Sequence, residues 1–253
     1  TYFIKFNQDK KIILPFMLSI GLLDLYYSFS TQNICFTKFL NPIQEKYPYI
    51  KMKDVFHPNL SNSPNLIKNS IILGKNNPRN LCITGPNASG KSVFMKTVIV
   101  NLILSQSLGI SFSQECIITP FNYIDSIFNI SDNLGRESLF EAQILRILKF
   151  INESSKIKKT IKNTKVKNEP YLSFLVVDEI LNSTNVDIGL STAYSILEYL
   201  IKIPNNIILS ATHYTTLSRL EIGYPKLIKN IMFDAEIING KVKYNYKFKN
   251  GIS

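Results

Sequence analysis

The 253-residue sequence predicts an α/β domain with a mainly parallel sheet flanked by helices. Short apolar runs at 81–84, 172–177 and 206–209 have the length and composition of buried strands. Helical patterns at 91–108 and 188–201 follow two of them, so strands and helices alternate along the chain. The hydrophobic fraction of 45% is ordinary for a folded protein and argues against disorder of the whole chain.

The N-terminal part has a different pattern. Residues 10–35 place apolar side chains at mixed spacings of three and four, which predicts a helix that packs on a neighbour. Two prolines then interrupt the pattern, and residues 49–73 contain short extended runs that we expect to form loops and edge strands. We therefore predict a helical segment at 1–48 and the α/β domain at 49–253.

The remaining elements complete the α/β pattern. We expect extended segments over 116–130, a second helix over 137–153 and a short helix near Leu217. The tail, 231–248, carries Asn-Gly at 239–240 between two strand-like runs, which predicts a C-terminal β-hairpin.

The cysteines and the early apolar run bear on the compartment. Cys35, Cys82 and Cys116 show no CxxC pairing, which argues against a zinc site and a disulfide framework and fits a reducing compartment, cytoplasm or nucleus. The apolar run at 12–23 is too short to span a bilayer and is followed by Asp24. We therefore expect no membrane partner.

The formal net charge of +11 suits a polyanionic partner such as a nucleic acid. The bias toward Lys, Asn and Ile is equally typical of an AT-rich genome, and both readings stay open. A lysine run follows the second predicted helix. We expect it to form a solvated loop, with a contact to the DNA backbone as the alternative. The run comprises Lys156, Lys158, Lys159, Lys162, Lys165 and Lys167.

A glycine-rich segment between the first buried strand and its helix matches the Walker A pattern GxxxxGK[ST]. We expect the nucleotide to contact Gly85, Pro86, Asn87, Ala88, Ser89, Gly90, Lys91, Ser92 and Val93. The glycines allow a tight turn near a phosphate, and the amides of the helix start face the anion. Lys91 is expected on the β and γ phosphates of ATP, and Ser92 on Mg²⁺. The alternative is a glycine-containing turn before an ordinary helix.

Two further segments follow buried strands. Asp178 and Glu179 end the apolar run at 172–177, where Asp178 would hold Mg²⁺ and Glu179 would act as general base toward the attacking water. His213 follows the strand at 206–209 and could sense the γ-phosphate and orient water. Acidic residues are common after strands, and an isolated His is more often a surface residue. The order of phosphate loop, acidic pair and histidine favours a P-loop ATPase.

These motifs together resemble those of the MutS family of DNA mismatch-repair proteins. Residues 84–92 are similar to its TGPNxxGKS loop, 178–179 to its DE pair and 211–214 to its ATH-aromatic motif. The resemblance covers nearly the whole chain. It implies a Mg²⁺-dependent, DNA-coupled ATPase of P-loop NTPase fold at 49–253, and the end of a helical lever or connector region at 1–48. It also implies a homodimer or heterodimer through the ATPase domains and a mismatched or branched DNA duplex as partner.

The resemblance adds two site residues. In the family, each composite site takes the phosphate loop from one subunit and a signature serine from the other, so Ser138 would contact the partner's γ-phosphate. A plain helix cap is the alternative. Leu66 falls where the family often has an aromatic residue against adenine, so an apolar wall is kept without stacking.

The chain also departs from the family pattern. An Arg-Gly-Thr-Ser-like turn usually follows the DE pair, whereas 182–185 reads Asn-Ser-Thr-Asn. A family Glu of the signature helix is Gln143 here. These changes bear on subunit communication and turnover more than on nucleotide binding, and they suggest a divergent branch.

Two other functions stay open. Another dimerising ATPase of ABC or SMC type would carry an LSGGQ-like signature, whereas 134–140 reads LGRESLF. A non-catalytic, nucleotide-gated interaction module is the second alternative, and the altered turn at 182–185 motivates it. The intact lysine of the phosphate loop and the intact acidic pair favour catalysis.

Overall fold

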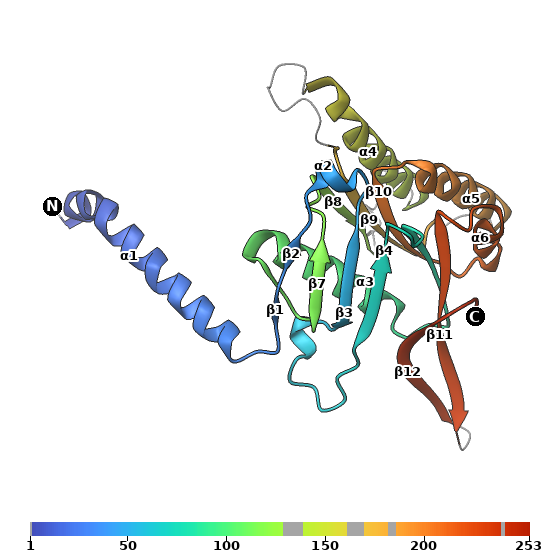
Figure 1. Ribbon diagram of the computed structural model, residues 1–253, viewed down its shortest axis with the longest axis horizontal. Coiled ribbons are helices and arrows are strands. Elements are labelled where there is room, and N and C mark those ends of the chain that lie inside the picture. Colours follow the sequence, from blue (N-terminus) through green and yellow to red (C-terminus); the bar gives the residue numbers. More distant parts are fainter. Residues whose placement is uncertain (1, 129–138, 161–169, 182–185, 239–240) are drawn as a thin grey trace. The chain divides into compact units, whose positions relative to one another are not determined.

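The computed structural model describes the backbone of residues 2–128, 139–160, 170–181, 186–238 and 241–253 (Figure 1). Side chains are described in these ranges except at 2–12, 139, 155–160, 238 and 241. Contacts divide the chain into two compact units, Thr1–Ile34 and Cys35–Ser253. The larger unit thus begins earlier than the boundary after residue 48 that the sequence suggests.

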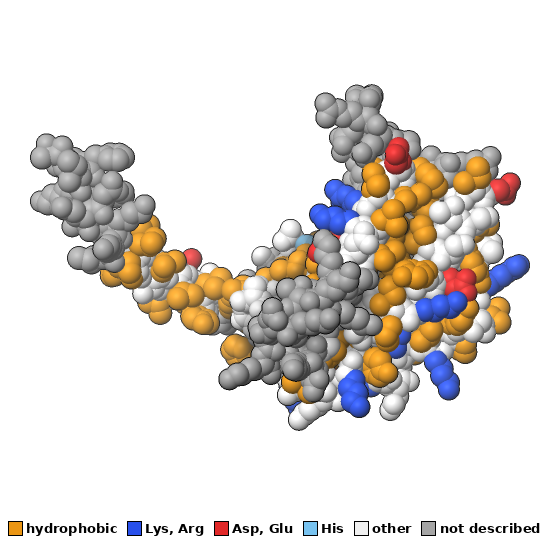
Figure 2. Space-filling view, turned by 90° about the horizontal axis from the view of Figure 1, so that it is seen from above, with side chains coloured by type: hydrophobic (Ala, Val, Ile, Leu, Met, Phe, Trp, Pro, Cys, Tyr) orange, Lys and Arg blue, Asp and Glu red, His pale blue; other side chains and the backbone are white. Residues whose placement is uncertain are grey.

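The smaller unit contains the helix α1 (Tyr2–Ser30). Hydrophobic side chains are exposed along its described part, among them Phe16 at 66% and Tyr27 at 72% (Figure 2). The window Ile13–Ser30 has a mean hydropathy of 1.4. By length and composition alone, this helix is long and apolar enough to cross a membrane. We expected the apolar run to end at residue 23, whereas the helix and the apolar window continue past Asp24 to Ser30. One such helix is weak evidence, since core helices of soluble proteins and signal sequences pass the same test, so the window assigns no membrane.

The larger unit is built on a six-stranded sheet in the order β12-β11-β5-β10-β9-β8. Its strands are β5 (Asn80–Thr84), β8 (Tyr123–Ile127), β9 (Ser173–Asp178), β10 (Asn206–Ala211), β11 (Ile228–Ile238) and β12 (Lys241–Asn250). Neighbouring strands are parallel except for the antiparallel pair β11–β12. Every residue of β5, β9 and β10 is buried, as in parallel strands covered on both faces. The predicted α/β class and C-terminal hairpin are confirmed.

A second sheet takes two strands from 49–73, for which we expected loops and edge strands, and one strand from each side of that segment. Its order is β2-β7-β3-β4, with β2 (Lys38–Phe39), β3 (Ile50–Val55), β4 (Asn69–Leu73) and β7 (Glu115–Ile118). The expectation is wrong for β3, which pairs on both sides and buries Ile50 and Met52. Shorter elements accompany this sheet, namely β1 (Cys35–Phe36), α2 (Pro42–Glu45), the 3-10 helix η1 (Pro58–Leu60) and β6 (Ile110–Ser111). Residues 35–48 therefore belong to the larger unit.

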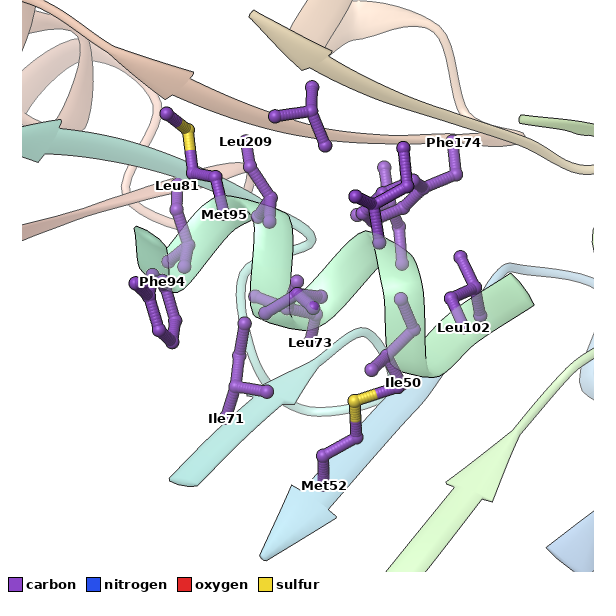
Figure 3. Packing of buried hydrophobic residues seen from close by; sticks show 14 of the residues in the cluster. Ile50, Met52, Ile71, Leu73, Leu81, Phe94, Met95, Leu102, Phe174 and Leu209 are labelled. Atoms are coloured by element: carbon purple, nitrogen blue, oxygen red, sulfur yellow. The ribbon is translucent and has the colours of Figure 1, made fainter. Parts of the chain in front are cut away.

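The helix α3 (Lys91–Leu108) lies between the two sheets (Figure 3). Its buried Met95 and Leu102 belong to one core with Leu81 and Leu209 of the six-stranded sheet and Met52 of the four-stranded sheet. Each such side chain stabilises the fold by about 1.5–3 kcal/mol through burial. This double contact fixes the helix whose first residues follow the glycine-rich turn.

The other face of the six-stranded sheet is covered by helices. These are α4 (Leu139–Thr160), α5 (Val186–Lys202), the 3-10 helix η3 (Thr215–Arg219) and α6 (Leu220–Gly223). Phe150 of α4 and Leu197 of α5 pack in one core with Leu175 of β9. The helix α4 extends past the predicted end at 153, so Lys156, Lys158 and Lys159 lie in a helix and not in the expected loop. The other lysines of that run, Lys162, Lys165 and Lys167, lie outside the described residues.

Candidate functional site

Three loops emerge side by side at one edge of the six-stranded sheet. Ala211 of β10 pairs with Ile83 of β5 on one side and with Asp178 of β9 on the other. Because the strands are parallel, their carboxyl ends stop at nearly the same level, and the segments that follow them share one edge. These segments are the glycine-rich loop, the acidic pair and the loop that carries His213.

The glycine-rich turn between β5 and α3 has the left-handed backbone that glycine permits. The φ angles are +145° at Gly85 and +106° at Gly90, and Ala88 also has a positive φ of +63°. A Cβ added to Gly85 would lie 2.6 Å from the carbonyl oxygen of Phe233 in β11. The close approach of β11 therefore requires glycine at 85.

The N-terminus of α3 can attract an anion. Gly90 is its N-cap and has no side chain to satisfy the first N–H groups. These groups have no acceptor within the helix, and the helix dipole adds a partial positive charge. Among the described residues, the buried Ser89 Oγ also lacks a hydrogen-bond partner. The turn thus presents several donors that a phosphate group could accept from.

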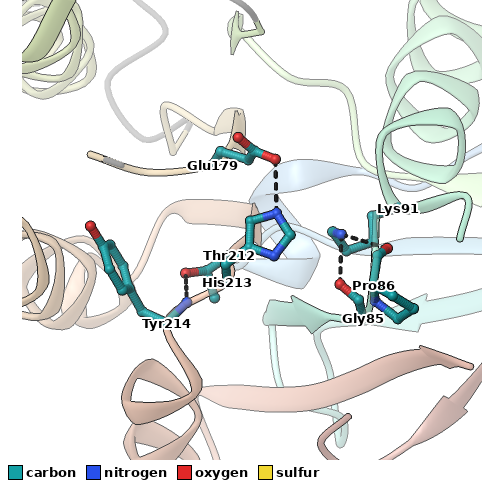
Figure 4. A network of polar contacts seen from close by, with 7 residues as sticks. All are labelled: Gly85, Pro86, Lys91, Glu179, Thr212, His213 and Tyr214. Atoms are coloured by element: carbon teal, nitrogen blue, oxygen red, sulfur yellow. Dashed lines mark hydrogen bonds and ion pairs between the residues drawn. The ribbon is translucent and has the colours of Figure 1, made fainter. Parts of the chain in front are cut away.

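Lys91 begins α3 and folds back over the loop (Figure 4). Its Nζ donates hydrogen bonds to the carbonyl oxygens of Gly85, at 2.7 Å, and Pro86, at 3.0 Å. Lys91 as a whole residue is only 5% exposed. Burial lowers the pKa of the Lys91 ammonium below its ordinary value, and the charges of Glu179 and Asp178 partly oppose this shift. The lysine and the acidic pair are therefore electrostatically coupled.

Asp178 is the last residue of β9 and is almost completely buried. Its Oδ1 lacks a hydrogen-bond partner among the residues that the structure describes. A buried carboxylate oxygen without a partner is costly in free energy unless a cation or a donor satisfies it. Ser92, the second residue of α3, could supply a hydroxyl ligand to the same cation. Oxygen donors of these two types fit Mg²⁺, which also takes ligands from phosphates.

Glu179 and His213 are in contact (Figure 4). His213 Nε2 lies 2.9 Å from Glu179 Oε1, and each side chain is 40% exposed. Glu179 has a left-handed backbone with φ of +56°, and its N–H donates to the carbonyl oxygen of Ala211 at 3.0 Å. The contact leaves both side chains accessible to water, as a general base and its orienting partner require.

A cavity of about 310 Å³ opens beside the start of α3. It lies within the size range of small-molecule sites, about 300–1,000 Å³. The lining residues are Val55, His57, Leu60, Ser63, Asn65, Leu66, Ile67, Asn69, Gly90, Val93, Phe94, Thr97 and Tyr246. Burial, and secondarily the charge of Lys96, lowers the pKa of His57. The lowered pKa favours the neutral form of the imidazole.

Tyr246 of β12 lines the cavity from the side of the hairpin. A Cβ added to Gly90 would lie 3.1 Å from Tyr246 Cδ1, so the tyrosine ring packs directly on the turn. Asn69 of β4 joins the two walls, because its Nδ2 donates to the carbonyl oxygen of Tyr246 at 3.1 Å and its Oδ1 accepts from the N–H of Phe248 at 3.3 Å. The cavity thus lies between elements that are far apart in the sequence.

The structure brings most of the predicted site residues to this edge. The loop with Lys91 lies beside Asp178 and Glu179, and Glu179 contacts His213. Leu66 lies in the cavity with Gly90 and Val93. Ser138 and the turn 182–185 lie outside the described residues. Sequence reasoning missed Tyr246. The hairpin signal at 239–240 predicted the two strands, but no spacing indicated that β12 returns to the phosphate loop.

Comparisons with known proteins identify related sequences. The family description MutS domain V matches residues 81–253. The DNA mismatch repair protein MutS of Fusobacterium nucleatum is 33% identical over 78% of this chain and 22% of its own length. The DNA mismatch repair protein MSH3 of Debaryomyces hansenii is 30% identical over 91% of this chain and 22% of its own length. A MutS protein of Staphylococcus aureus is 24% identical over 98% of this chain. The chain spans about a fifth of the length of the first two relatives.

Proposed function

Because the chain belongs to the MutS family, we propose that it is the ATP-binding and ATP-hydrolysing domain of a MutS-like mismatch-repair protein. The main support is the convergence of a buried lysine, two carboxylates and a histidine at one sheet edge. Lys91 is coupled to Asp178 and Glu179, and Glu179 contacts His213 at 2.9 Å. These are the charge types that hold a nucleoside triphosphate and activate water.

Each side chain has a distinct proposed task. Lys91 would exchange its hydrogen bonds to the loop carbonyls for oxygens of the β and γ phosphates. Glu179 would accept a proton from the attacking water, and His213 would orient the carboxylate and the water. Bound Mg²⁺ would neutralise charge on the phosphates. Asp178 and Ser92 would hold that ion, which would satisfy the Asp178 oxygen that lacks a hydrogen-bond partner among the described residues.

The cavity beside Gly90 would receive the base and ribose of ATP. Leu66 supplies an apolar wall, as the family resemblance suggested, and Tyr246 supplies an aromatic ring on the turn itself. Stacking lost at position 66 is therefore replaced from the hairpin. The neutral His57 keeps a positive charge out of the lining.

We predict that Tyr246→Ala weakens ATP binding about tenfold to a hundredfold, because base–aromatic stacking contributes about 1–3 kcal/mol. Titration of a fluorescent ATP analogue measures the affinity. Tyr199→Ala is the matched control, since Tyr199 is an exposed tyrosine of α5 outside the cavity lining. Equal affinities for all three proteins would place the base elsewhere.

The hydrolysis itself is tested with the chain as it stands. We expect phosphate release from ATP that requires Mg²⁺ and is abolished by chelation, measured in single-turnover mode with and without duplex DNA. Tight ATP binding without any release would support the nucleotide-gated interaction module instead. Stimulation by mismatched or branched duplexes over matched duplex would support the proposed DNA coupling.

Dimerisation is the remaining part of the proposal. We propose that two ATPase domains, from the same or a related protein, assemble when ATP is bound, and that Ser138 reaches the partner's γ-phosphate. The support is the family membership and the place of Ser138 in the sequence, next to Leu139, the first described residue of α4. Sedimentation velocity with ATP, with ADP and without nucleotide measures the association. A mass that never changes with nucleotide would leave Ser138 with the role of a helix cap.

A further inference from the structure

The turn that carries Glu179 has a strained backbone. Glu179 and Leu181 have φ angles of +56° and +53°, although neither is glycine. Left-handed backbone at residues other than glycine costs roughly 1–2 kcal/mol each. Such conformations persist when neighbouring contacts hold them in place. Leu181 is completely buried, so its backbone polar groups must also find partners within the protein.

Two side chains from different elements hold the backbone of Leu181. Gln143 of α4 is buried, and its Oε1 accepts a hydrogen bond from the N–H of Leu181 at 2.9 Å. The hydroxyl of Tyr214 donates to the carbonyl oxygen of Leu181 at 3.1 Å. The two hydrogen bonds approach the same residue from its two peptide groups. They fix the orientation of the backbone two residues after Glu179.

The hydrogen bond from Tyr214 also connects the turn that carries Glu179 to the loop that carries His213. Tyr214 follows His213 directly, and its own N–H donates to Thr212 Oγ1 at 2.9 Å (Figure 4). The N–H of Thr212 in turn donates to the carbonyl oxygen of Ile83 at 3.0 Å, just before the phosphate loop. One chain of contacts thus runs from α4 through Leu181 and Tyr214 to the loop that presents His213.

We propose that Gln143 is a positioning residue, which holds the Leu181 peptide so that the carboxylate of Glu179 stays in contact with His213. The side-chain hydrogen bonds of Gln143 and Tyr214 go to the backbone N–H and carbonyl oxygen of Leu181, so both residues act on the acidic turn through its backbone. The inference rests on the proposed ATP hydrolysis. It connects α4 to the proposed general base, Glu179, through the backbone of Leu181. The hydrogen bond from the Leu181 N–H requires an acceptor oxygen at position 143, and the side chain of either Gln or Glu supplies one.

The test compares Gln143→Leu, which removes the acceptor, with Gln143→Glu, which keeps it. We expect single-turnover hydrolysis by Gln143→Leu to fall about a hundredfold, the size of effect that a displacement of about 1 Å at a catalytic group produces. ATP affinity should stay at the parent value, because the phosphate loop is untouched. Gln143→Glu should hydrolyse ATP at the parent rate, because it keeps the acceptor oxygen. Tyr214→Phe, which removes the other hydrogen bond with a smaller change in packing, should slow hydrolysis in the same way.

Gln106→Leu is the matched control. Gln106 of α3 holds another backbone segment in the same manner, since it accepts from the N–H of Phe121 at 2.8 Å and donates to the carbonyl oxygen of Phe121 at 3.0 Å. Its loss should lower the melting temperature without selective loss of the hydrolysis rate. Hydrogen exchange at the Leu181 amide should accelerate in Gln143→Leu and not in Gln106→Leu.

The outcomes separate the two proposals. A parent chain that binds and hydrolyses no ATP overturns the proposed function, and the positioning role falls with it. A parent chain that hydrolyses ATP, together with Gln143→Leu at the parent rate, overturns the positioning role alone. The positioning role is also overturned if Gln143→Glu hydrolyses ATP as slowly as Gln143→Leu, or if Gln106→Leu slows hydrolysis as much as Gln143→Leu does.

Discussion

Lys91→Ala is expected to weaken ATP binding by at least about a hundredfold, which corresponds to ~3 kcal/mol for the loss of hydrogen bonds from a charged donor. Lys91 is buried and its ammonium already donates to two carbonyl oxygens of the loop, so it is held where the phosphates would approach. Alanine leaves the turn and the helix start in place but removes the positive charge. Isothermal titration calorimetry with a non-hydrolysable ATP analogue measures the change.

Lys96→Ala provides the control for this prediction. Lys96 lies on the same helix five residues later and is exposed, and its Nζ lies 5.3 Å from the centroid of the Phe128 ring. The Lys96→Ala substitution removes the same charge as Lys91→Ala but leaves the hydrogen bonds to the loop carbonyl oxygens in place. We expect its ATP affinity to stay close to the parent value. If both variants lose affinity equally, the effect is one of net charge and the assignment of Lys91 to the phosphates is lost.

Glu179→Gln is expected to keep ATP binding and to slow hydrolysis by about a hundredfold to ten-thousandfold, the usual contribution of a general base. The amide cannot accept a proton from water, although it can still form a hydrogen bond with His213. Rapid-quench measurement of a single turnover gives the rate, and the same titration as above gives the affinity. Because ATP then persists, the proposed nucleotide-dependent dimer should also last longer.

The control for the carboxylate is Glu236→Gln. Glu236 is an exposed residue of β11 whose Oε1 accepts from Asn245 Nδ2 at 2.8 Å. We expect its hydrolysis rate to equal that of the parent chain. Parent-like hydrolysis by Glu179→Gln would remove Glu179 from the role of general base. In that case His213 would be the next residue to substitute.

Much of the fold followed from local patterns. The apolar runs of β5, β9 and β10 are continuous because both faces of a parallel strand are buried, and this makes them recognisable without any tertiary information. The helix α3 has the bounds that the sequence predicted, 91–108, because Gly90 and Gly109 in left-handed conformation flank it. The second sheet was not recognised, because its strands are short and come from segments separated by the whole of α3.

The sequence by itself determined which residues make up the proposed site, namely the glycine-rich loop, the acidic pair and the histidine, and in what order they follow one another. The spacing of the motifs along the sequence shows this order, because the glycine-rich loop, the acidic pair and the histidine each follow a separate buried strand. Only the tertiary structure decided the contacts among them. The carboxylate of Glu179 meets His213, Tyr246 returns to Gly90, and Gln143 reaches Leu181 because strand pairing and helix packing join segments that are distant along the chain. A hydrogen bond between such segments leaves no local pattern, since any polar side chain of suitable length can form it.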